Sequence, residues 1–129
     1  MAESLLKELQ PGAVLALHGE LGSGKTCFVQ GLAQAMGVRR PVGSPTFTLV
    51  NEYEATPCTL YHIDLYRISG PQEALGLGLD EYLHGNGITA IEWAERVAVL
   101  LPSKTMHIEF QAGPSERERV IRIRRGDRA

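Results

Sequence analysis

Gly19, Gly24, Lys25 and Thr26 have the types and spacing of a phosphate-binding loop. Gly19 precedes four residues, Glu20-Leu21-Gly22-Ser23, which lead into Gly24-Lys25-Thr26, and together they match that pattern in full. Glycines let the backbone curl closely around an anion, so that successive N–H groups point at it. Lys25 is then expected to reach the β- and γ-phosphates of a nucleotide, and the Thr26 hydroxyl to bind magnesium.

The segments on either side of this loop are those that a phosphate-binding loop requires. Residues 14–17 form a short apolar run, typical of a buried parallel strand. Residues 26–36 predict a helix whose apolar stripe comprises Phe28, Val29, Leu32, Ala35 and Met36. The alternative, a glycine-rich turn with a chance Gly-Lys-Thr, is not favoured by this strand–loop–helix context.

Two acidic residues end predicted strands, and ligands of open α/β sheets bind at the carboxyl ends of strands. Glu92 follows the mainly apolar residues 88–91, which is the usual arrangement of the acid on the magnesium side of a phosphate loop, so we assign the metal to Glu92. Asp64 ends the predicted strand 59–64 and is expected to hold a magnesium-bound water or to orient the attacking water. Either residue could instead be an exposed acid at a strand end.

Thr46 and Trp93 are the remaining candidates near the site. Thr46 lies in a predicted loop, residues 44–48, where nucleotide switches place a hydroxyl that senses the γ-phosphate through magnesium. A plain proline turn with a threonine at the start of a strand is an equally good interpretation. Trp93 directly follows Glu92 and could pack over the site, contact a partner or belong to the core.

The order of these segments predicts a three-layer α/β domain, like that of P-loop NTPases, with a mixed parallel and antiparallel sheet. Strands 46–53 and 59–64 are joined by a short turn, which favours an antiparallel pair. Short helices are expected at 4–9, 71–75, 79–83 and 95–101, and late strands at 106–110 and 120–124. Residues 1–129 are expected to form one domain, in which residues 125–129 are a frayed tail.

The composition limits the classes of function. The formal charge of −2 gives no general electrostatic reason to bind nucleic acid, and no apolar run approaches the roughly 18 residues that a membrane span needs. Cys27 and Cys58 are far apart and the four histidines lack zinc-ligand spacing, as in a reduced cytoplasmic protein. A phosphate-binding core needs most of this length, so we expect nucleotide hydrolysis to signal to a partner.

Arginines concentrate near the C-terminus, where Arg122 and Arg124 would share one face of a strand. They could contact RNA or a nucleotide. Because Glu116 and Glu118 are interspersed and no aromatic residues accompany them, a solvated edge strand is the favoured interpretation.

Four segments in this order make the chain similar to the TsaE (YjeE) family, the small ATPases of bacterial threonylcarbamoyladenosine tRNA modification. The segments are 17–26, Ser44-Pro45-Thr46-Phe47-Thr48-Leu49-Val50, His62-Ile63-Asp64-Leu65-Tyr66-Arg67 and Ile91-Glu92-Trp93. The phosphate loop alone occurs in very many proteins, whereas the ordered set is specific. The resemblance covers residues 9–110.

The resemblance implies that Glu20 to Thr26 bind ATP and that Thr26 and Glu92 hold Mg2+. It implies that Thr46 lies in a switch-like loop and that Asp64 and Trp93 matter for turnover. It further implies that the partners are TsaB and TsaD, that tRNA is contacted only through their complex, and that the protein is cytoplasmic, with no membrane partner. ATP hydrolysis would support the modifying assembly without performing the carbamoyl transfer.

Two departures from the family pattern affect nucleotide recognition. Family members usually have a longer N-terminal segment that includes a residue near the adenine, and here the chain starts too late to contain it. The arginine-rich C-terminal segment matches weakly, and Arg117 is only loosely matched to a nucleotide-contacting position.

The sequence bears differently on three alternative functions. A small-molecule kinase would need an acceptor pocket and an arginine-bearing lid, for which no segment is long enough. A GTPase would need an Asn-Lys-x-Asp guanine reader, which the sequence lacks. A nucleotide-dependent binding module that barely hydrolyses ATP stays open.

Overall fold

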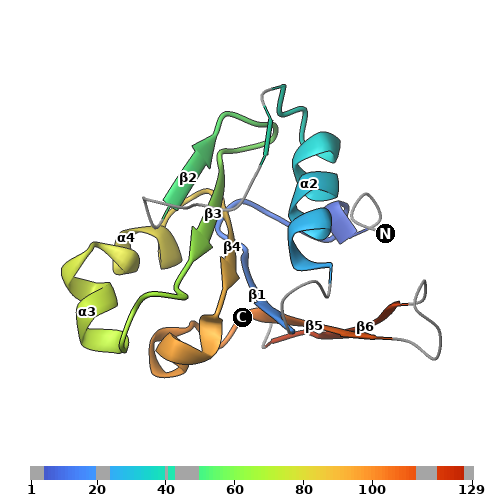
Figure 1. Cartoon of the computed structure of the whole chain (residues 1–129). Helices are drawn as coiled ribbons and strands as arrows, with labels where there is room; N and C mark the ends of the chain where they lie inside the picture. The colour runs from blue at the N-terminus through green and yellow to red at the C-terminus, as the bar shows by residue number, and fades with distance from the viewer. Residues whose placement is uncertain (1–4, 20–23, 40, 43–49, 113–118, 127–129) are drawn as a thin grey trace.

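The computed structural model describes residues 5–19, 24–39, 41–42, 50–112 and 119–126. The strands are β1 (Val14–His18), β2 (Val50–Tyr53), β3 (Leu60–Asp64), β4 (Ile88–Glu92), β5 (Met106–Ala112) and β6 (Arg119–Arg124) (Figure 1). The helices are α2 (Lys25–Ala35), α3 (Pro71–Gly76), α4 (Leu79–Leu83) and the 3-10 helix η1 (Ala94–Leu100). Among the described residues, no helix is both long enough and apolar enough to cross a membrane.

The six strands form one mixed sheet in the order β2-β3-β4-β1-β5-β6. The four central strands are parallel to one another, and the edge strands β2 and β6 each pair antiparallel with their neighbour. The predicted mixed sheet and the antiparallel pair of β2 with β3 are confirmed, while residues 46–49 of the first predicted strand lie outside the described residues. Arg122 and Arg124 are exposed on the edge strand β6, as the edge-strand interpretation predicted.

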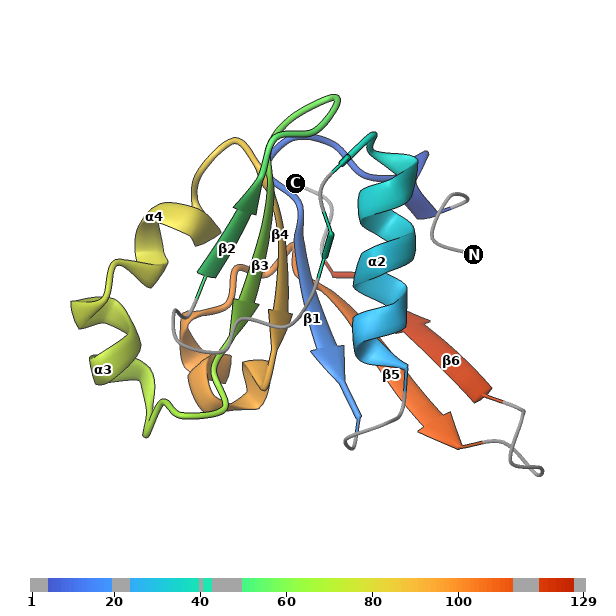
Figure 2. The same ribbon diagram turned by 45° about the horizontal axis from the view of Figure 1, so that its top comes forward.

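The sheet lies between two layers of helices, which confirms the predicted three-layer α/β fold (Figure 2). Leu15 and Leu17 pack with residues of α2, whereas Val14 and Ala16 pack in a second cluster with residues of α4 and η1. This alternation is the two-residue period of a strand that is buried on both faces. β1 is therefore held from both sides where it leads toward Gly19.

Glycines mark both ends of α2. Gly24, the N-cap, has a φ of 108°, and Gly37 follows the helix with a φ of 81°. The N–H of Gly37 donates to the Gln34 carbonyl and the N–H of Val38 donates to the Ala33 carbonyl, which is the hydrogen-bond pattern of a Schellman motif. The helix predicted over residues 26–36 is confirmed, with both bounds one residue earlier.

Three local predictions differ from the structure or are refined by it. The helix expected over 95–101 is a 3-10 helix that begins at Ala94 and is kinked at Val97. The helix expected over 4–9 is helical at residues 5–6 and then turns. Arg125, placed by sequence in a frayed tail, makes an ion pair of 2.7 Å with Glu8.

Gly87 precedes β4 at a point where a side chain has no room. A Cβ atom there would overlap the Tyr61 ring and would lie 2.8 Å from the Thr59 carbonyl oxygen. Gly87→Ala is therefore expected to destabilise the fold by about 1–3 kcal/mol, since the Thr59 carbonyl accepts from the N–H of Ile88 and cannot easily move away. Urea denaturation measures this loss. Gly76→Ala is the matched control, because nothing lies within 4 Å of a Cβ at that position, and equal stabilities of the two variants would contradict the prediction.

Candidate functional site

Three parallel strands end at the edge of the sheet from which α2 begins. In the register, Asp64 of β3 lies beside Glu92 of β4, and Glu92 lies beside Leu17 of β1. Figure 2 shows the ends of β1, β3 and β4 at the same edge as the first turn of α2. Because Leu17 packs with α2, the side chains of Asp64 and Glu92 share the face of the sheet that α2 covers.

Lys25 is a buried cation at the start of α2, with 5% of its surface exposed. Its Nζ donates a hydrogen bond of 2.7 Å to the carbonyl of Gly19. The Gly19 carbonyl thus holds the ammonium group between the end of β1 and the start of α2, where it could offer a positive charge to an anion. Gly24 carries no side chain over the first turn of α2, and that turn contains no acidic residue, so nothing there opposes an anion electrostatically.

Several predicted site residues cannot be placed in this geometry. Glu20, Leu21, Gly22 and Ser23 of the loop, Thr46 of the expected switch, and Arg117 all lie outside the described residues. Thr26, which does lie within them, is half-buried in the first turn of α2, next to Lys25.

Glu92, the predicted magnesium ligand, is buried and paired with a histidine. Its Oε2 lies 2.6 Å from Nε2 of His62, and the exposed fractions of the two side chains are 7% and 0%. His62 stands two residues before Asp64 on the same face of β3. No role in the site was predicted for His62 from the sequence. The signal that could have identified it is its position two residues before Asp64 on the same predicted strand, because alternate residues of a strand share one face.

Asp64, the predicted water-orienting acid, has a different environment. Its Oδ1 accepts a hydrogen bond of 2.9 Å from the backbone N–H of Tyr66. Burial raises the pKa of the Asp64 carboxyl, and the neighbouring Glu92 adds to this effect. The Tyr66 N–H, His62 and Lys25 act in the opposite direction. The two acids at this edge of the sheet are thus unlike in both exposure and bonding.

Trp93 adjoins the site through an uncommon backbone conformation. Its φ of 61° lies in the left-handed region, which costs energy for a bulky residue and is typical of functional sites. Its ring lies 5.1 Å from Nζ of Lys25 and 5.4 Å from the guanidinium of Arg96, and the Tyr66 ring is also 5.1 Å away. Trp93 therefore lies against the phosphate-loop lysine. The sequence gave no sign of the contact with Arg96.

A second cluster of titratable groups occupies the opposite face of the sheet, beside the end of β1. Nε2 of His18 lies 2.9 Å from Nδ1 of His107, and Nδ1 of His18 lies 3.6 Å from Oε2 of Glu95. Burial lowers the pKa of His107, helped by Arg124 and His18 and opposed by Glu109.

This lowered pKa predicts a pH dependence of stability. Because the folded state resists protonating His107, the unfolded state binds more protons as the pH falls below about 6.5. The contribution of His107 to stability is therefore complete above that pH and is lost as the pH falls toward the lower folded pKa. His107→Gln should reduce the fall in melting temperature between pH 7 and pH 5. His84→Gln, at an exposed histidine, is the control, and an equal effect of both variants would contradict the assignment.

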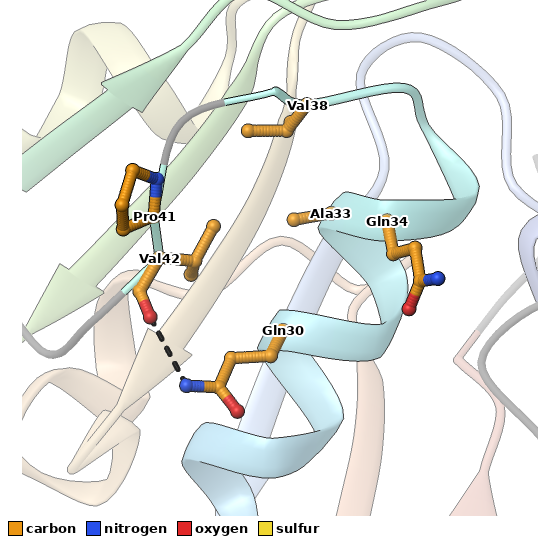
Figure 3. Close-up of a pocket in the computed structure, with 6 residues that line it drawn as sticks. All are labelled: Gln30, Ala33, Gln34, Val38, Pro41 and Val42. Carbon is orange, nitrogen blue, oxygen red and sulfur yellow. Dashed lines mark hydrogen bonds between the residues drawn. The ribbon is translucent and has the colours of Figure 1, made fainter.

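A pocket of about 330 Å³ lies along the middle and end of α2 (Figure 3). It is lined by Gln30, Ala33, Gln34, Val38, Pro41 and Val42, and the Gln30 amide donates to the Val42 carbonyl across it. None of the lining residues is charged, and the pocket does not include Lys25, Asp64 or Glu92. It is therefore distinct from the candidate site at the start of α2.

The side chains at the strand ends suit a magnesium ion that is shared with a nucleotide better than a metal ion held by protein side chains alone. Among the described residues, no group of three or more His, Cys, Asp or Glu side chains could hold a metal ion. Magnesium usually takes only one or two protein carboxylates and obtains its other ligands from phosphates and water. Glu92 and the hydroxyl of Thr26 match that smaller requirement.

The sequence and the fold were compared with known proteins. Residues 1–121 match the family model for "Threonylcarbamoyl adenosine biosynthesis protein TsaE". The chain is 46% identical over 110 residues to the tRNA threonylcarbamoyladenosine biosynthesis protein TsaE of Bacillus subtilis, covering 84% of this chain and 68% of the relative. It is 44% identical over 103 residues to the protein of the same name from Treponema pallidum, covering 80% of this chain and 76% of the relative.

A solved structure agrees with the sequence comparison. The crystal structure of Bacillus subtilis YdiB is similar to this chain with a TM-score of 0.78 and 38% sequence identity, over 93% of this chain and 72% of that chain. The family model and the two relatives carry the same family name, and the solved structure shares the fold of this chain.

Proposed function

The chain belongs to the TsaE family of threonylcarbamoyl adenosine biosynthesis proteins, and on this premise we propose that it is an ATPase that supports threonylcarbamoyladenosine modification of tRNA. The observation that carries the proposal is the buried Lys25, which is hydrogen-bonded to Gly19. It begins a helix at the sheet edge where Asp64 and Glu92 end their strands. A fixed cation, a helix N-terminus and two carboxylates are the parts that phosphoryl transfer needs.

In this proposal, residues Glu20 to Thr26 bind the phosphates of ATP, and Arg117 contacts the nucleotide. Lys25 supplies positive charge at the β- and γ-phosphates, where charge builds up during transfer. Asp64 orients the attacking water, and Thr46 responds to the γ-phosphate. Trp93 lies against Lys25 and shields its ammonium group from solvent.

Thr26 and Glu92 would hold Mg2+. When bound, the ion would neutralise charge on the phosphate oxygens. His62 and the backbone keep Glu92 buried at the strand end, so that this carboxylate is in place before any ligand arrives.

We further propose that the chain acts on a complex of the TsaB and TsaD proteins in the cytoplasm, and that it meets tRNA only through that complex. Hydrolysis by the chain alone is expected to be slow. The membership in a tRNA threonylcarbamoyladenosine biosynthesis family supports this assignment.

The decisive experiment measures ATP hydrolysis by the purified chain at varied Mg2+, with and without the TsaB–TsaD pair. Magnesium-dependent hydrolysis that the pair stimulates is the expected result. Nucleotide binding without hydrolysis in either condition would indicate a binding module, and phosphate transfer to an added small acceptor would indicate a kinase. Either of these outcomes would overturn the proposed function.

A further inference from the structure

The two acids at the sheet edge are neighbours of like charge, yet they are bonded differently. Asp64 and Glu92 are paired in the β3–β4 register, and Glu92 helps to raise the pKa of Asp64. Asp64 is half-buried and accepts a backbone N–H, whereas Glu92 is buried and contacts an imidazole. The two carboxylates are chemically similar, but their surroundings differ in burial and in hydrogen bonding.

The residue that makes the surroundings of Glu92 different from those of Asp64 is His62. It is fully buried in the centre of β3, one strand away from Glu92 and one pleat behind it, since the register pairs His62 with Ala90. Its Nε2 lies 2.6 Å from Oε2 of Glu92, which is short for a hydrogen bond between nitrogen and oxygen, and bonds to an ionised partner are the shorter ones. Both groups belong to central parallel strands, so the backbone fixes their separation.

The other nitrogen of the imidazole indicates which group donates. Nδ1 of His62 is buried and has no hydrogen-bond partner among the described residues. A proton on Nδ1 would be left without an acceptor, which is more costly than an unused lone pair. The arrangement is therefore best satisfied when Nε2–H donates to Glu92 and the carboxylate accepts.

A buried pair of this kind is not required for folding. A hydrophobic pair of similar volume often stabilises a core as well or better, because both polar groups must be removed from water. Leu60 and Ile88, one pleat further from the site on the same two strands, are such a pair. The polar pair occurs only where β3 and β4 reach the site.

We propose that His62 is a positioning residue that fixes the carboxylate of Glu92 for Mg2+ and so makes Glu92, rather than Asp64, the metal ligand. This inference rests on the proposed function. A hydrogen bond to the outer side of a ligating carboxylate restricts its orientation, and loss of such a partner typically weakens metal binding about 10–100-fold. His62 itself touches neither nucleotide nor metal in this assignment.

The test compares two variants. His62→Leu removes the donor and puts an apolar side chain in place of the imidazole, whereas His62→Gln carries an amide that can replace the Nε2–H. Mn2+ serves as the probe, and its affinity for the complex of the protein with a non-hydrolysable ATP analogue is measured by electron paramagnetic resonance. The Mn2+ affinity is expected to be about 10–100-fold weaker for His62→Leu and largely restored for His62→Gln. The affinity for the ATP analogue at saturating Mn2+ is expected to change little in either variant.

Thr89→Val is the matched control. Thr89 is fully buried on β4, and its hydroxyl donates to the Tyr82 carbonyl of α4 at 3.3 Å, so this variant also loses a hydrogen bond made by a buried residue of the same sheet. It is expected to lower the melting temperature without changing Mn2+ affinity. If His62→Leu behaves as Thr89→Val does, His62 has only a structural role and the inference is wrong.

Two further outcomes are informative. If His62→Leu does not fold, the wild-type protein labelled with 15N-histidine replaces it. The Nε2 proton resonance of His62 should then shift when Mg2+ is added to the complex with the analogue, and an unchanged resonance would overturn the inference. If the wild-type protein binds the analogue with no dependence on Mn2+ or Mg2+, the proposed metal site fails, and the inference fails with it.

Discussion

Lys25→Ala is expected to lower ATP hydrolysis by about 100-fold or more, the range found when a preorganised donor to the transition state is removed. Lys25 is buried, and Gly19 already orients its ammonium group, so bound phosphates would meet a charge that needs no further ordering. Alanine leaves the loop backbone in place but removes that charge. Nucleotide affinity should fall with turnover, because the ground-state phosphates also lose their counter-charge.

The measurement is the steady-state rate of ATP hydrolysis with the TsaB–TsaD pair present, together with nucleotide affinity by calorimetry. Lys7→Ala provides the control for general charge effects, since Lys7 is an exposed lysine in the segment before β1. Lys25→Arg tests geometry as well as charge. An arginine fork is larger and does not replace an ammonium group that sits between a carbonyl and an indole ring. Near-normal turnover by Lys25→Ala would remove the basis of the site assignment.

The central strands were predictable because their physical signal is local. The apolar run 14–17 and the mainly apolar run 88–91 are each followed by a polar residue, and such runs form strands buried on both faces. Gly37 and Pro71 marked the end of α2 and the start of α3 in the same way. Periodicity and turn residues act within one element, so a single sequence carries them in full.

The contacts that complete the site were less predictable because they join distant positions. His62 and Glu92 are separated by 30 residues, and the sequence placed both in strands without saying that these strands are adjacent. The ion pair between Arg125 and Glu8 spans 117 residues, and a charged, polar tail gives no local sign of it. The left-handed backbone of Trp93 had no signal either, since that conformation is rare for tryptophan.

Glu92→Ala is expected to change the magnesium dependence of hydrolysis more than Asp64→Ala does. Glu92 is the buried acid held by His62, which suits a fixed metal ligand, so its loss should raise the Mg2+ concentration needed for half-maximal activity. Asp64 is more open and accepts from Tyr66, which suits a group that orients water. Asp64→Ala should therefore lower the maximal rate and leave the Mg2+ requirement nearly unchanged.

Stability separates the two variants independently of activity. Glu92→Ala leaves the buried imidazole of His62 without its acceptor, which should cost about 1–3 kcal/mol in unfolding free energy. Asp64→Ala should not destabilise the fold at neutral pH. The pKa of Asp64 is raised in the folded state, so its charge opposes folding once the pH exceeds the raised pKa. Asp64→Ala removes that unfavourable contribution at neutral pH. The contribution is absent at pH values below the usual aspartate range, so the substitution should give no gain in stability there.

Magnesium titrations of hydrolysis and urea denaturation at neutral and acidic pH test both halves of this prediction. Because the two acids lie side by side in the register, an exchange of their roles would leave the overall fold and the Lys25 result unchanged. It would appear only as a reversed order, in which Asp64→Ala raises the Mg2+ requirement and Glu92→Ala lowers the maximal rate. That outcome would move the metal to the more exposed acid, and the buried pair of Glu92 with His62 would then serve the water-orienting step.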